Sequence, residues 1–221
     1  QTVPFKAEDI KVSQLSFYVQ DEYLVSEDFN LMYGVRVDIP MYTNPVANPF
    51  STSLNALDEN GKTEKIDQGQ LPKSTPLFSP RVGFNWDMMG DRSTQLRGGT
   101  GIFTGRLPFV WVGNVISNPG QNPNLPVHQR SFDLNAADPE FKWPQAWTTN
   151  VAVDEKLPGD MIGTLEVLYS KDINAVFVRN ADLTGPARFL PNDGRPFYGG
   201  GGANELNGPF DGGIYVIDNT S

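Results

Sequence analysis

The chain has 221 residues, a net charge of −9 at pH 7 and no cysteine. The acidic balance argues against non-specific binding to nucleic acid or anionic headgroups, and the lack of cysteine excludes disulfides and cysteine metal sites. No apolar stretch approaches the roughly 18 residues of a transmembrane helix, but a membrane-spanning strand needs only alternating apolar residues.

Two alternating stretches predict a first β-hairpin over residues 13–38. A period of two places apolar side chains on one face of a strand and polar ones on the other. The apolar residues of both strands have odd numbers, so the numbers of directly paired residues have an even sum. This requires a connection with an odd number of residues, such as residues 26–28. Asp21 interrupts the apolar face, and Pro40 is expected to end the second strand because proline cannot donate to a ladder. The apolar set is Leu15, Phe17, Val19, Tyr23, Leu31, Tyr33, Val35 and Val37.

The same pattern predicts a central hairpin over residues 80–106 and a third over residues 146–170. Both pass the same parity test, and their connections are short. The second strand of the central hairpin contains glycine at three of the four positions 98–101, which marks a bend or a close approach of another backbone, and bending of the strand is the expected role. The apolar sets include Val82, Phe84, Trp86, Leu96 and Ile102, then Trp147, Val151, Val153, Leu165, Val167 and Tyr169.

Long segments rich in proline, glycine and asparagine separate the hairpins, over residues 41–79, 107–144 and 181–213. Loops of this length are uncommon inside a compact soluble domain. Here they alternate strictly with short turns, which is the plan of an outer-membrane barrel. A short strand is expected around residues 175–179, and residues 214–221 are typical of a strand cut off soon after it starts.

This alternation leaves two interpretations of the polar faces. In a transmembrane barrel they line a polar, wet lumen, whereas burying them in a soluble sandwich would be costly without partners. The barrel is therefore favoured: an all-β, antiparallel up-and-down transmembrane β-barrel of which residues 1–221 form part of a single domain. The lumen-facing set would be Arg36, Asp38, Arg81, Asn85, Arg97 and Glu166.

Candidate functional residues are few. Arg36, Arg81 and Arg97 are weak candidates for binding an anionic substrate, and the alternative is ion pairing with lumen carboxylates. His128 is the only histidine, so no metal site, cofactor or catalytic constellation is expected and the protein is predicted not to be an enzyme. The segment from Asp58 to Gly61 is interpreted as a plain turn, because Gly69 stands where a calcium loop needs glutamate.

Aromatic residues of the second long loop are the other weak candidates for substrate or partner binding. The alternative is that they pack the loop against its neighbours. The set is Phe109, Trp111, Phe132, Phe141 and Trp143.

The three hairpins together resemble the barrel of TonB-dependent outer-membrane receptors, particularly the Oar-like group. The sequence LSFYVQDEY (residues 15–23) with NLMYGVRVD (30–38) is similar to the "YxQDxW" and "LTLxxGLRYD" strands of that family. SPRVGF (79–84) resembles "SPRLGFAY", and LRGGTGIF (96–103) resembles "LRGGYGIF". KLPGD (156–160) followed by EVLY (166–169) resembles the hairpin "eLPgd…vgYv", and their order extends the match over most of the chain.

The resemblance implies a barrel segment in the bacterial outer membrane, from a receptor that takes up a large solute. Members have about 22 strands and a plug domain. It also implies TonB as a partner, although no TonB box is found in this chain, with outer-membrane lipid around the wall and a surface lipoprotein or other protein as a further partner. The alternatives are an outer-membrane barrel for adhesion, secretion or surface assembly, and a soluble all-β binding module.

Overall fold

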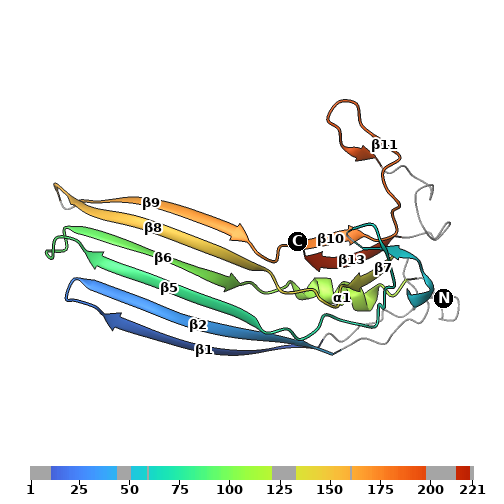
Figure 1. The fold of residues 1–221 in the computed structure, drawn as a ribbon, viewed down its shortest axis with the longest axis horizontal. Coiled ribbons are helices and arrows are strands. Elements are labelled where there is room, and N and C mark those ends of the chain that lie inside the picture. Colours follow the sequence, from blue (N-terminus) through green and yellow to red (C-terminus); the bar gives the residue numbers. More distant parts are fainter. Residues whose placement is uncertain are drawn as a thin grey trace, which may run out of the picture.

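The structure is a computed structural model that describes residues 11–43, 51–58, 60–120, 133–159, 161–197 and 213–219. Six long strands form one antiparallel sheet in the order β1-β2-β5-β6-β8-β9 (Figure 1). These strands are β1 (Val12–Leu24), β2 (Phe29–Tyr42), β5 (Leu77–Asp87), β6 (Thr94–Thr104), β8 (Gln145–Leu157) and β9 (Met161–Asp172). The three predicted hairpins are therefore confirmed, and the sheet has the up-and-down order expected from the sequence.

The register of the sheet agrees with the parity argument. Leu24 pairs with Asn30, and the amide of Val25 donates to the carbonyl oxygen of Phe29 at 3.0 Å, which leaves the three-residue connection 26–28. All paired positions in the three hairpins have even sums, as in Phe84 with Gly98 and Val151 with Val167. The two alternating sets therefore stay on opposite faces across all six strands.

The prediction that Pro40 ends its strand is wrong, because β2 continues to Tyr42 with Pro40 opposite Gln14 of β1. The pairing of β2 with β5 ends two residues before Pro40, at Asp38 opposite Leu77. A proline is tolerated where β2 has a neighbouring strand on one side only. A backbone nitrogen on the unpaired side donates no hydrogen bond to the sheet, so its missing hydrogen costs nothing there.

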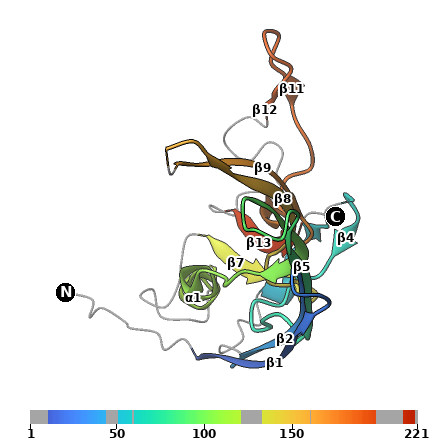
Figure 2. The same ribbon diagram turned by 90° about the vertical axis from the view of Figure 1, so that its left-hand side faces the viewer.

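The long segments fold into a loop layer beyond one end of the six-stranded sheet. It contains helix α1 (Phe109–Ser117) and a three-stranded sheet in the order β10-β13-β7. Figure 2 shows the six-stranded sheet end-on as a curved wall, with α1 and β7 on its concave side. The three strands of the loop-layer sheet are β10 (Val176–Asn180), β13 (Ile214–Asn219) and β7 (Leu134–Ala137).

Short elements complete the loop layer: η1 (Ser51–Ser53), β3 (Ala56–Leu57) paired with β4 (Thr63–Glu64), and β11 (Arg188–Phe189) paired with β12 (Pro196–Phe197). The hairpin of β11 and β12 projects away from the rest of the layer (Figure 1). Within the part of the chain that the structure describes, no helix has the length and apolar character needed to cross a membrane.

Two buried apolar clusters hold the loop layer together. The first gathers Leu71, Leu77, Leu107, Val112, Val115, Ala137, Phe141, Trp143 and Ile217. The second gathers Leu54, Ala56, Ile66, Leu134, Ala136, Ala181, Ile214 and Val216. Each cluster draws on segments far apart in the sequence, and the second cluster joins residues of all three long loops.

This organisation corrects and extends the sequence analysis of the long loops. The strand expected around residues 175–179 is β10, and the final strand is β13, which pairs with β10 and lies parallel to β7. Helix α1 was not predicted. Its valines and isoleucine are β-branched and have modest helix propensity, and the helix is stabilised by burying Val112 and Val115.

Candidate functional site

The polar face of the sheet lies on the concave side of the wall. At the loop end of this face Asp38 and Pro40 are buried, and the indole nitrogen of Trp143 donates a hydrogen bond to the hydroxyl of Tyr42. Since Trp143 belongs to the core of the loop layer, the layer packs on the same face that carries Asp38, Pro40 and Tyr42. The polar face is therefore the candidate lumen surface.

Asp38 is the most strongly held side chain of this face, with 2% of its surface exposed. Its Oδ1 accepts hydrogen bonds from Gln14 Nε2 at 2.7 Å and from Ser16 Oγ at 2.6 Å. The guanidinium of Arg36 donates to the same carboxylate, with Nη2 2.9 Å from Oδ1. Four donors from two strands thus compensate the burial of one charge.

The other predicted arginines also have partners on this face. Arg97 Nε lies 2.8 Å from Asp154 Oδ2, and Thr164 donates to the other oxygen of that carboxylate. Arg81 donates to the side-chain oxygen of Gln20 on β1. Ion pairs with carboxylates are thus present for Arg36 and Arg97, whereas the partner of Arg81 is an amide.

Glu166 and Asn85, the remaining members of the predicted set, lie on the same face. Asn150 Nδ2 donates to Glu166 Oε1 at 2.8 Å, and Asn85 is opposite Arg97. Cross-strand hydrogen bonds and ion pairs therefore run along this face from β1 to β9. Such a surface can attract a polar solute, but its arginines already have acceptors.

The opposite face is apolar and open. Its exposed apolar side chains come from β1, β2, β5, β8 and β9, as in Phe17, Val82 and Leu165, whereas those of β6 are half-buried. Asp21, which interrupts this face, accepts a hydrogen bond from the hydroxyl of Tyr33 at 3.0 Å, directly across the β1–β2 pair. The one charge that the sequence left unexplained thus has an adjacent donor.

Close approach, the second of the two roles considered for the glycines of β6, accounts for their positions. A Cβ atom on Gly98 would lie 2.8 Å from the carbonyl oxygen of Asn150 and 3.0 Å from the ring of Phe84. A Cβ atom on Gly99 would lie 2.9 Å from the carbonyl oxygen of Val82. The Phe84 ring therefore lies against the glycine opposite it, and larger residues at these positions would separate the strands.

Arg179 is a buried charge that the sequence analysis did not single out. Its side chain is 7% exposed, with Nη2 2.6 Å from Glu64 and Nε 3.0 Å from Asp218. It also donates to the carbonyl oxygen of Leu57. One buried guanidinium thus links β10 to β4 and β13 and to the end of β3. Nothing in the sequence around a single arginine of a short alternating strand indicates that it will be buried between two carboxylates.

Burial also shifts the titration of the acids around this arginine. It raises the pKa of Glu64, although the neighbouring Arg179 opposes the shift. Burial likewise raises the pKa of Asp138, which lies in the loop between β7 and β8. These acids, Arg179 and Val216 line a hollow of about 60 Å³, too small for a solute larger than a few waters.

The aromatic candidates of the second long loop divide into two groups. Phe141 and Trp143 are 2% and 1% exposed and belong to the first apolar cluster, against which Trp111 also packs. For these residues the structure shows the packing role that was the alternative to binding. Phe109 is 47% exposed at the start of α1. Phe132, like His128, lies outside the described residues.

The segment after β3 forms the turn expected from its sequence. Asp58 Oδ1 accepts hydrogen bonds from the amides of Asn60 and Lys62 at 2.9 and 2.8 Å, and Gly61 has a φ of 76°.

Within the described ranges, no group of three or more His, Asp or Glu side chains is placed to hold a metal ion.

Comparison with known proteins supports the membrane interpretation. Residues 1–207 match the family described as outer membrane beta barrel domain. No curated protein matches the chain, and no solved structure matches it. The family match places the protein in the outer membrane and decides against the soluble binding module. An antiparallel up-and-down sheet, one apolar face, one polar face and this match lead to one conclusion: the chain belongs to the outer membrane beta barrel domain family.

Proposed function

We propose that this chain forms part of the barrel wall of a TonB-dependent outer-membrane receptor of the Oar-like group, which takes up a large solute. The observation that carries the proposal is the difference between the two ends of the sheet. Connections such as residues 26–28 close one end, whereas the other end carries a loop layer with its own buried core. In outer-membrane barrels short turns are periplasmic and long loops are extracellular. The loop layer would therefore face the exterior and contact the solute.

The motifs of the hairpins support the finer assignment. Strand sequences such as LRGGTGIF in β6 follow the pattern of the Oar-like group over successive hairpins. The arginines of the polar face already have acceptors within the wall, on Gln20, Asp38 and Asp154. A face whose charges need no partner from outside the wall fits a barrel whose lumen is occupied by a plug. We further propose that the protein binds and passes its solute without catalysing a reaction, and that TonB and a surface protein are its partners.

A second candidate function has its own observation in favour. The hairpin of β11 and β12 projects from the loop layer with Phe189 64% and Phe197 41% exposed (Figure 1). Arg188 lies over the ring of Phe197, with Cζ 4.9 Å from its centroid. An exposed aromatic hairpin is typical of a protein contact, so adhesion, secretion or surface assembly remains the alternative.

Binding of TonB separates the two candidates. The full-length protein, purified in detergent, would be titrated with the purified periplasmic domain of TonB. Transport predicts saturable binding that is lost when the TonB box of the full-length protein is deleted, and that deletion variant is the matched control. Lack of binding, or binding that survives the deletion, would contradict the transport proposal and favour the alternative.

A further inference from the structure

The six-stranded sheet splits between β5 and β6 at its loop end. The β5–β6 pairing runs only from Arg81 opposite Gly101 to Asp87 opposite Gln95. On either side the pairing continues further, to Leu77 between β2 and β5 and to Thr104 between β6 and β8. The first residues of β5 and the last residues of β6 are therefore held by their outer neighbours while they separate from each other.

Side chains bridge this split where the backbone ladder stops. The hydroxyls of Ser79 and Thr104 lie 2.8 Å apart. Gln145 Nε2 donates to the carbonyl oxygen of Phe78 at 3.1 Å and to Thr104 Oγ1 at 3.0 Å. These bonds supply polar partners that the missing ladder does not, so the split is a stable feature of the wall.

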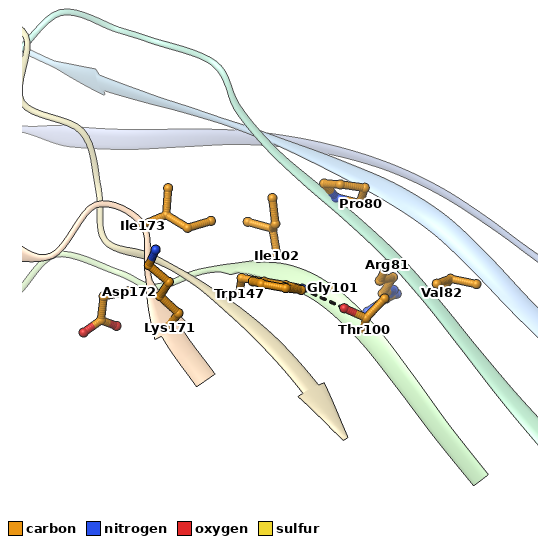
Figure 3. A pocket seen from close by; sticks show the side chains of 10 residues that line it. All are labelled: Pro80, Arg81, Val82, Thr100, Gly101, Ile102, Trp147, Lys171, Asp172 and Ile173. Atoms are coloured by element: carbon orange, nitrogen blue, oxygen red, sulfur yellow. Dashed lines mark hydrogen bonds between the residues drawn. The ribbon is translucent and has the colours of Figure 1, made fainter. Parts of the chain in front are cut away.

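A hollow of about 790 Å³ lies at the split (Figure 3). Its walls include Pro80 and Val82 of β5, Ile102 of β6 and Trp147 of β8, all of which belong to the apolar set of the sheet. The Trp147 indole donates to Thr100 Oγ1 at 2.7 Å, which fixes the ring against the floor of the hollow. The hollow is thus a mainly apolar recess on the face that meets lipid.

Two cations line the hollow, Arg81 and Lys171, and Arg81 already donates to Gln20 on β1. Lys171, near the loop end of β9, is exposed and forms no ion pair within the described residues. In Figure 3 the side chain of Asp172 points away from the ammonium group of Lys171. The acids of the apolar face lie towards the turn end, where Asp21 bonds to Tyr33 and Glu155 accepts from Thr94. The charge on this face therefore changes sign from one end to the other.

We propose that the hollow between β5 and β6 binds an acyl chain of a phosphorylated glycolipid of the outer leaflet, with a phosphate of that lipid on Lys171. The proposal rests on the orientation given under the proposed function, with the loop layer outside. That orientation places the hollow in the outer leaflet and Lys171 near its headgroups. A lysine near a lipid surface has an electrostatic attraction for phosphate, and the apolar recess accepts the chain.

Native mass spectrometry of the full-length protein tests this site. Purified lipid A, which carries phosphates, is the probe, and phosphatidylcholine is the zwitterionic comparison. We expect retained lipid A on the wild type and about fivefold weaker retention in Lys171→Gln, the change expected for one lysine–phosphate attraction at a lipid surface. Lys156→Gln, an exposed lysine at the turn end of the same hairpin, is the matched control and should retain lipid A as the wild type does.

A second variant tests the recess itself. Ile102→Trp fills the hollow and should reduce retention of lipid A while the folded protein keeps its heat-dependent gel migration. The proposal is overturned if the wild type retains no lipid A, if the two lysine variants behave alike, or if Ile102→Trp retains lipid A as the wild type does. Each of these results is independent of TonB binding, so failure here is distinguishable from failure of the transport proposal.

Discussion

Apolar side chains are exposed on one face of the wall of this protein and buried in the core of its loop layer. In the wall Leu165 and Val167 are 74% and 68% exposed, and apolar residues of β1, β2, β5 and β8 are exposed as well. In the core of the loop layer Phe141 and Trp143 are 2% and 1% exposed, and only outlying parts such as the β11–β12 hairpin keep aromatic side chains exposed. The same residue types thus meet two solvents, lipid around the wall and water around the layer.

The two regions also differ in how they hold charge. Arg97 of the wall is 41% exposed in its pair with Asp154, whereas Arg179 of the loop layer is 7% exposed between Glu64 and Asp218. A pair on a wet surface contributes little to stability, but removing one member of a buried pair leaves an uncompensated charge. Substitutions matched between the two regions therefore test whether they are distinct units.

The largest effect is expected from Trp143→Ala. Removing this buried ring should destabilise the loop layer by about 3–5 kcal/mol, since the change leaves a cavity in its core. Tyr42 would lose its donor as well. Hydrogen exchange of the amides in β7 and β13 measures the opening free energy. Trp147→Ala, on the exposed face of the wall, is the control and should leave that exchange unchanged.

A comparable loss is expected from Arg179→Met, which keeps the length of the side chain but leaves the carboxylates of Glu64 and Asp218 without their cation. The expected destabilisation of the loop layer is about 3–5 kcal/mol. The matched change in the wall, Arg97→Met, should cost less than about 1 kcal/mol because its ion pair is solvated. Hydrogen exchange in β4 and β10 gives the measurement, and equal effects of the two substitutions would contradict the distinction.

The wall was predictable from the sequence because its rules are local. Alternation and parity placed Arg36 and Asp38 on one face and Val35 on the other, and the register agrees with that assignment. Even the carboxylate partner of Arg36 lies only two positions along the same strand.

The loop layer was not predictable in the same way because its contacts are long-range. Trp143 bonds to Tyr42, about a hundred residues earlier, and β13 lies parallel to β7 across a long separation. No local pattern indicates which loop will cover Phe141 or bring Glu64 to Arg179. Turn chemistry, as at Asp58, was the exception because it depends on neighbouring residues.

An intermediate effect is expected from Val35→Arg in the wall. Val35 lies on the apolar face opposite Val19, and a charge there would enter lipid, at a cost of about 2–4 kcal/mol near the bilayer midplane. Met32→Arg, on the polar face opposite Glu22, should be tolerated. Urea unfolding of the full-length protein in lipid vesicles compares them, and equal damage would refute the assignment of the two faces.

The smallest effect concerns the pH dependence of the loop layer. Because burial raises the pKa of Glu64, the folded layer binds its proton more tightly than the open layer does. The opening free energy should therefore increase as pH falls through the raised pKa towards the ordinary value of 4.5, and change no further from this group below it. Glu64→Gln, which keeps the shape of the side chain, should flatten this dependence and leave the part due to Asp138, whose pKa is raised by burial too. Hydrogen exchange of β4 at a series of pH values measures the difference between the wild type and the variant. The prediction is contradicted if the opening free energy of the wild type decreases towards acid pH by more than that of the variant. In that case the attraction of Arg179 for the Glu64 carboxylate outweighs the effect of burial.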